Sequence, residues 1–146
     1  MMDILQALDD PHIFAPHFRG SSWKPWKAAL AAIFALPMDD EALATYRACT
    51  GRSEAPTAPF QEAAFCVGRR GGKSRVLALI AVYLASFRDY RPHLAPGECA
   101  TIVIMAANRA QARSIFRFVI GLLKAVPLIQ PMIIEDNTDA VKSRHH

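Results

Sequence analysis

The first apolar positions of the chain recur at helical spacing. Residues 3–10 predict one short helix, which Pro11 ends. Beyond residue 21, four apolar side chains share one helical face before Pro37 ends the pattern. They are Trp26, Leu30, Ile33 and Phe34. This spacing predicts a second, longer helix, with Ser21 or Ser22 as its cap.

A third helix is predicted directly after Pro37. Acidic residues crowd its first turn, where the helix dipole favours them, and Gly51 follows its last turn. Together with the preceding helix, this segment predicts a helical hairpin in the N-terminal part of the chain. Residues 52–59 are rich in Ser, Pro and Ala and predict a linker.

Two uninterrupted apolar runs farther along the chain predict buried strands. The first covers residues 63–67. The second covers residues 100–106 and is rich in β-branched side chains, which suits a parallel strand buried on both faces. Between them, residues 75–87 have helical spacing and are apolar nearly all round, so this helix should be covered on more than one side. The three elements predict a right-handed strand–helix–strand unit, and therefore an α/β fold with a parallel sheet.

One more helix is predicted from Asn108, which can cap it. Its inward stripe consists of Ile115, Phe118, Val119, Leu122 and Leu123. Arg109, Arg113 and Arg117 recur every fourth residue and form an outer ridge. That ridge is either a solvated helix face or a surface that follows a phosphate backbone.

The turn between the first predicted strand and the helix after it carries candidate chemistry. It reads Val67-Gly68-Arg69-Arg70-Gly71-Gly72-Lys73-Ser74. Glycines allow successive main-chain N–H groups to turn inward around an anion, and a following helix adds unpaired N–H groups and the positive end of its dipole. The pattern therefore predicts a phosphate-binding loop. The alternative is a basic surface turn that happens to end in Gly-Lys-Ser.

Individual residues of this loop have separate expected roles. Lys73 should reach the β- and γ-phosphates, and the Ser74 hydroxyl should ligate Mg²⁺. Val67 departs from the consensus GxxxxGK[ST], which has glycine at that position. The freedom of the backbone comes from three glycines, which are Gly68, Gly71 and Gly72.

Composition narrows the class of protein. With 146 residues, 52% of them hydrophobic, the chain is one domain at most and can build a core. The net charge of +4 permits a polyanionic partner such as nucleic acid but does not require one. Cys49, Cys66 and Cys99 lie far apart without metal-ligand spacing, which indicates free thiols in a reducing compartment. We find no signal-peptide pattern and no uncharged run of the ~20 residues that a membrane span needs, so we expect a cytoplasmic protein without a membrane partner.

Four short segments together resemble a known family. They read Trp23-Lys24-Pro25-Trp26, Cys49-Thr50-Gly51-Arg52, Gly68-Arg69-Arg70-Gly71-Gly72-Lys73-Ser74 and Ala106-Ala107-Asn108-Arg109-Ala110-Gln111-Ala112. Through them, residues 21–126 resemble the N-terminal ATPase part of the large terminase subunit of tailed bacteriophages. Members of that family often carry a loop variant without the first consensus glycine, which accounts for Val67.

The resemblance implies a fold and an activity. The fold is the N-terminal half of a P-loop NTPase core of the RecA/ASCE type over residues 60–146, a parallel sheet flanked by helices, with residues 1–59 as a helical segment and linker before it. The activity is that of an ATP-driven motor that packages viral DNA, joined in complete members to a metal-dependent nuclease domain. The implied cofactors are ATP and Mg²⁺. The implied partners of the full-length protein are double-stranded DNA, the portal and the small terminase subunit, in the cytoplasm of the host cell.

The residue roles that the resemblance carries over fall mostly on the loop. Lys73 and Ser74 would bind phosphate and Mg²⁺. Arg69 or Arg70 would be the catalytic arginine finger in cis, and Arg69 is favoured. Trp26 is similar to the family's adenine-side segment, so it contacts either the base or the protein core.

Two parts of a working motor are not found in the sequence. Hydrolysis needs a second acidic motif after an apolar strand, and the one candidate, Ile133-Ile134-Glu135-Asp136, has its acids in the reverse order. The C-terminal tail is too short to hold the three acidic residues expected of the nuclease, and residues 142–146 show no pattern of a folded segment. We therefore expect a truncated chain that binds nucleotide weakly without turning it over. In the family's fold the strands at 63–67 and 99–106 are not neighbours, so both should keep exposed edges, and the fragment should be marginal or rely on partners.

Two other functions stay open. A small P-loop kinase would need an acidic pair and a lid of arginines after its second strand, and neither is evident. A non-enzymatic module would bind nucleic acid or phosphate by charge alone. Its cations would be Arg69, Arg70, Lys73, Arg75 and the ridge that begins at Arg109.

Overall fold

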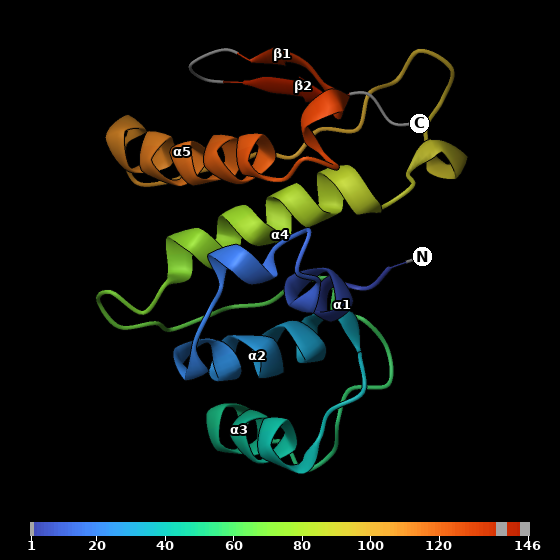
Figure 1. The fold of residues 1–146 in the computed structure, drawn as a ribbon. Helices are drawn as coiled ribbons and strands as arrows, with labels where there is room; N and C mark the ends of the chain where they lie inside the picture. The colour runs from blue at the N-terminus through green and yellow to red at the C-terminus, as the bar shows by residue number, and fades with distance from the viewer. Residues whose placement is uncertain (1, 137–139, 144–146) are drawn as a thin grey trace.

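The structure is a computed structural model that describes residues 2–136 and 140–143. Most of its regular segments are helices (Figure 1). The α-helices are α1 (Ile4–Asp9), α2 (Lys24–Phe34), α3 (Asp40–Thr50), α4 (Lys73–Phe87) and α5 (Arg109–Ala125). The short 3₁₀ helices are η1 (Ala15–His17), η2 (Ser21–Trp23), η3 (Arg91–His93) and η4 (Gln130–Met132), and the strands are β1 (Ile133–Asp136) and β2 (Val141–Ser143).

Helix α4 is the central element of the molecule. In Figure 1, α5 lies along one side of it, and α1 and α2 lie on the other. Its sequence explains this position, because its side chains are apolar on several faces and Val76, Leu79 and Val82 are almost completely buried. The prediction of a helix covered on more than one side is therefore confirmed. The largest fully buried side chains, which form one core around α4, are Phe14, Ile4, Leu30, Leu79, Ile129, Val76, Val82 and Val126.

The predicted helices are confirmed, and local capping explains several of their ends. The Asp39 carboxylate accepts a hydrogen bond from the Ala42 N–H at 2.8 Å, and the Asn108 side chain accepts one from the Gln111 N–H at 2.9 Å. Gly51 ends α3 in the left-handed conformation, at φ 70°. The expected serine cap of α2 is wrong, because Trp23 precedes this helix and donates no side-chain cap.

The α2–α3 hairpin is also confirmed and leads the chain toward α4. The Lys24 ammonium joins the start of α2 to the Glu41 carboxylate of α3 at 2.9 Å. After α3, the linker returns to α2, where the Phe60 N–H donates to the Ile33 carbonyl at 2.9 Å. The following coil runs beneath α4 in Figure 1 and turns into the N-terminus of that helix. The hairpin thus sets the path by which the glycine-rich loop reaches α4.

The predicted parallel sheet is wrong, and with it the RecA/ASCE-like P-loop NTPase fold. Residues 63–67 and 100–106 form no strand in the described part of the chain. Both runs are exposed instead, with exposed fractions of 48% for Phe65, 70% for Val103 and 84% for Met105. A strand needs a neighbour for its main-chain N–H and C=O groups, and an apolar strand needs cover on both faces. Neither run has such a neighbour among the residues described, so the strand–helix–strand unit does not form.

The one sheet in the described residues is an antiparallel hairpin of β1 and β2. Asp136 pairs with Val141 and Ile133 with Ser143. Residues 142 and 143 therefore have regular structure, contrary to expectation. The candidate acidic motif ends on β1, away from any parallel strand, and the side chains of Glu135 and Asp136 lie outside the described ones.

The longest described helix is α5, with 17 residues and charged side chains along its length. Among the residues that the structure describes, we find no helix with the length and apolar character needed to cross a membrane.

Candidate phosphate-binding loop

The glycine-rich loop turns sharply into the N-terminus of α4. Gly72 precedes the first helical residue, Lys73, and adopts the left-handed conformation at φ 80° and ψ 3°. Arg70 also has a positive φ, 61°. The Gly71 N–H donates to the Gly68 carbonyl at 3.3 Å and closes the turn. The loop was predicted to lie between a strand and a helix. The glycine-rich segment does lead into a helix, but no strand precedes it among the described residues, and phosphate binding stays a prediction.

Three main-chain N–H groups at this helix start are available to a ligand. Within the described residues, the N–H groups of Gly72, Lys73 and Ser74 donate to no protein acceptor, and the first internal bonds of the helix come from Arg75 and Val76. The free N–H groups of a helix start, with the positive end of the helix dipole, attract anions. The backbone geometry is therefore compatible with a bound phosphate group.

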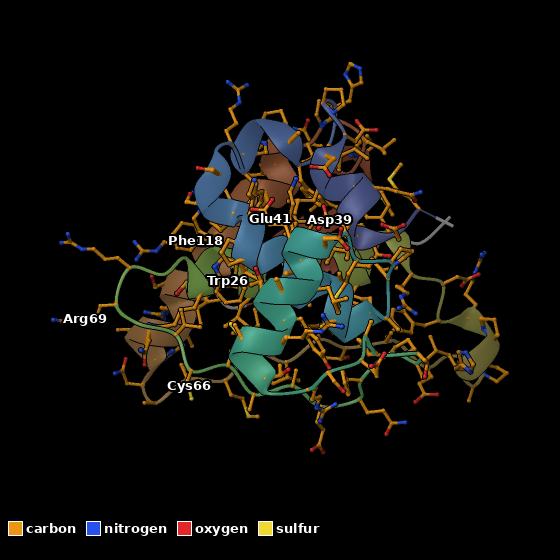
Figure 2. All side chains as sticks on the ribbon, turned by 90° about the horizontal axis from the view of Figure 1, so that it is seen from below. Trp26, Asp39, Glu41, Cys66, Arg69 and Phe118 are labelled. Atoms are coloured by element: carbon orange, nitrogen blue, oxygen red, sulfur yellow. The ribbon has the colours of Figure 1, made fainter. Side chains whose placement is uncertain are left out.

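The loop borders a cavity of about 590 Å³ lined by Arg69, Arg70 and Lys73. All three side chains are exposed, and the lining contains no carboxylate. Figure 2 shows Arg69 at the outer edge of the molecule, pointing away from the helices. Three cations without an acidic counterpart create a positive potential, which favours a multiply charged anion such as a di- or triphosphate.

The three glycines of the loop meet different steric conditions. A Cβ on Gly71 would lie 2.5 Å from the Val67 side chain, and one on Gly72 would lie 3.1 Å from the ring of Trp23. A Cβ on Gly68 would meet nothing within 4 Å. The structure therefore requires glycine at positions 71 and 72, and it gives no steric reason for glycine at position 68.

Trp23 and Trp26 contact the loop at Gly72 and Gly71, which the sequence pattern did not indicate. The Trp26 indole N–H donates to the Gly71 carbonyl at 2.7 Å. Its ring also contacts the ring of Phe65, with centroids 5.7 Å apart. Trp26 is half-buried and packs against the core, so the core contact, one of the two alternatives that the sequence left open, is present. The sequence placed Trp26 on the apolar face of a helix, and the family resemblance suggested a base contact, but neither indicated a contact with the loop.

Ser74 is half-buried and lies on the first turn of α4. Its hydroxyl is the one side-chain oxygen in residues 68–74, and Mg²⁺ prefers oxygen ligands and retains several waters when it binds through substrate phosphates. The described residues contain no group of three or more His, Cys, Asp or Glu side chains that could hold a metal ion. The residues present thus fit the phosphates of a nucleotide well and supply little for a metal ion alone.

Arg75 is committed to a structural contact. Its guanidinium donates to the His17 carbonyl and lies over the rings of Phe18 and Trp23, about 5 Å from each centroid. It also borders a second cavity, of about 320 Å³, together with Arg117 and Phe118 of α5. Arg75 therefore belongs to the wall between the N-terminal segment and α5, and it is not among the residues that line the loop cavity.

Comparison of this chain with protein-family models, with curated proteins and with solved structures found no match in any of the three. The kinship with terminases therefore stays a prediction from the motifs in residues 21–126.

Proposed function

We propose that this chain binds the phosphates of Mg·ATP at residues 68–74, as the nucleotide-binding portion of a terminase-like motor that drives viral DNA packaging. The observation that carries the proposal is the set of three free N–H groups at the start of α4 beside a cavity lined only by cations. The proposal depends on the loop and the helix, and not on a parallel sheet. Double-stranded DNA, the portal and the small terminase subunit are the partners of this function, in the host cytoplasm.

Each residue of the loop has its own role in binding the nucleotide. The free N–H groups and Lys73 hold the phosphate oxygens, because charge-assisted hydrogen bonds to phosphate are stronger than neutral ones. The Ser74 hydroxyl takes one position on Mg²⁺. Arg69 and Arg70 also line the cavity and are exposed, and Arg69 is the preferred arginine finger. Since the lining contains no carboxylate to orient water, we expect nucleotide binding without turnover at the rate of a motor.

Lys73→Ala tests this function directly. Loss of a charged hydrogen-bond donor should weaken Mg·ATP binding by roughly 10- to 100-fold, as measured by isothermal titration calorimetry. The matched control is Arg91→Ala in η3, which also removes one cation but lies beyond the other end of α4 (Figure 1). Equal affinities of wild type and Lys73→Ala for Mg·ATP would contradict the proposal.

The second candidate is a charge-only module that binds nucleic acid or phosphate. It is favoured by one observation, the exposure of all three cations that line the cavity. Under this function, Lys73→Ala should weaken Mg·ATP and duplex DNA to the same extent, and both affinities should fall steeply with salt. Under the nucleotide-binding function, Lys73→Ala should weaken Mg·ATP and leave the DNA affinity nearly unchanged.

A further inference from the structure

The Trp26 side chain joins two parts of the chain that are far apart in sequence. Its indole N–H and the Gly71 carbonyl form a 2.7 Å hydrogen bond across 45 residues. Trp26 lies in the first turn of α2, a helix anchored in the core through Leu30. The acceptor belongs to the peptide unit that also carries the first of the available N–H groups, that of Gly72. The bond therefore connects a fixed helix to the part of the loop that would contact an anion.

Because the peptide unit is planar, this hydrogen bond also fixes the direction of the Gly72 N–H. In a trans peptide unit, the C=O of one residue and the N–H of the next point in opposite directions, and none of the described peptide bonds is cis. Because the Gly71 carbonyl points at Trp26, the Gly72 N–H must point away from α2. The indole thus determines where one of the three available N–H groups is aimed.

This restraint is needed because the loop is intrinsically pliable at this point. Glycine adopts left- and right-handed backbone conformations with similar ease, so the unit between Gly71 and Gly72 can rotate at little cost. The ring of Trp23 lies against Gly72 and fills space, but no hydrogen bond from Trp23 to the loop is found among the described residues. The directional restraint comes from the Trp26 N–H.

We propose that Trp26 is a positioning residue of the anion site, which holds the Gly72 N–H in its ligand-facing direction through the Gly71 carbonyl. The inference rests on the proposed function and assigns Trp26 a role other than base contact. Trp26 touches no ligand in this role. Its contribution lies in having the peptide unit oriented before the anion arrives, so that binding does not have to order it.

The sharpest test removes the indole N–H and keeps the ring. Replacement of Trp26 by β-(3-benzothienyl)alanine exchanges the N–H for sulfur in a side chain of nearly the same shape. Trp26→Phe is the encodable variant. Loss of one hydrogen bond of ordinary strength should weaken Mg·ATP and inorganic tripolyphosphate by about 3- to 10-fold, with calorimetry as the measurement. Phosphate probes without a base are used because the inferred effect acts on the phosphates alone.

A readout at the amide itself separates positioning from packing. In ¹⁵N-labelled wild type, tripolyphosphate should shift the Gly72 N–H resonance strongly, and in the benzothienyl variant this shift should be much smaller. The melting temperature of the variant should fall by no more than the loss of one hydrogen bond accounts for, since the ring still packs on Phe65 and the core. A purely structural Trp26 would lower the melting temperature and leave the amide response intact.

The possible outcomes distinguish the two proposals. If wild type binds Mg·ATP and both Trp26 variants bind it equally well, the positioning role is refuted and the nucleotide-binding function stands. If wild type binds neither Mg·ATP nor tripolyphosphate, both proposals fall. If wild type binds, the variants bind more weakly and the Gly72 amide loses its response, the positioning role is supported.

Discussion

Gly72 adopts a left-handed backbone conformation at the turn into α4. It adopts φ 80°, and a Cβ at this position would lie 3.1 Å from two atoms of the Trp23 ring. Two independent features therefore favour glycine here, the left-handed backbone and the adjacent indole. By contrast, Arg70 adopts a positive φ with a long side chain, at the tip of the loop that borders the cavity. Backbone conformations of this kind are concentrated in functional loops.

Gly72→Ala should therefore destabilise the protein by about 1–2 kcal/mol, because the left-handed conformation disfavours a Cβ and the Trp23 ring must shift to accommodate it. Urea unfolding monitored by circular dichroism measures the change. Gly68→Ala is the matched control, since its Cβ would meet nothing within 4 Å and its φ is not positive. Equal stabilities of the two variants would show that the turn at Gly72 is not constrained as described.

The sequence predicted the cations of the site, but it did not predict the tryptophan contact with the loop. Lys73, Arg69 and Arg70 were predicted as neighbours of one anion site because they are close in sequence, and they do line one cavity. The contact of Trp26 with Gly71 could not be predicted, because it depends on how α2 packs against a loop 45 residues away. A local pattern indicates which face of a helix is apolar, and it does not indicate which carbonyl that face meets.

Helices could be predicted from the sequence and strands could not, and the reason is physical. A helix satisfies its main-chain hydrogen bonds within one segment, so apolar spacing was sufficient to predict α2 and α4, and the caps at Asp39 and Asn108 supported the prediction of α3 and α5. A strand depends on a neighbour that its own sequence does not name. The runs at 63–67 and 100–106 have the composition of strands and lack that neighbour in the described residues, so they remain exposed coil.

Residues 100–106 consequently form an aggregation-prone segment. They are uncharged, rich in β-branched side chains and free of proline, and Val103 and Met105 are 70% and 84% exposed. Segments of this kind pair with copies of themselves when they are accessible. We therefore expect wild type to self-associate as its concentration rises, which light scattering or sedimentation velocity would detect.

Val103→Lys should suppress this association, because a charge interrupts the uniform apolar run. The side chain is exposed, so the substitution should change the free energy of unfolding by less than about 0.5 kcal/mol. Leu128→Lys is the matched control: Leu128 is 61% exposed and lies outside the segment. Equal suppression by both variants would indicate that net charge, and not this segment, governs association.

One core joins the elements that position the loop. The N-terminal segment contributes Ile4 and Phe14, α2 contributes Leu30, and all three are buried together with Leu79 of α4. Because the loop begins at one end of α4 and is held by Trp26 of α2, its geometry depends on the packing of these two helices. No sheet lies next to the site in the part of the chain that the structure describes, so the helical core must supply its rigidity.

A matched pair of substitutions on α4 tests this dependence. Leu79 is 1% exposed and Leu77 is 50% exposed, and both lie in the same helix. Leu79→Ala leaves a cavity in the core and should cost about 2–5 kcal/mol, whereas Leu77→Ala should cost less than about 1 kcal/mol. Domains of this size are stable by only about 5–15 kcal/mol, so Leu79→Ala removes a large share of the total. Urea unfolding gives both values, and similar losses for the two variants would contradict the central position of α4. At temperatures where Leu79→Ala is largely unfolded, Mg·ATP binding should disappear with the helical signal, because no separate layer of strands remains to hold the loop.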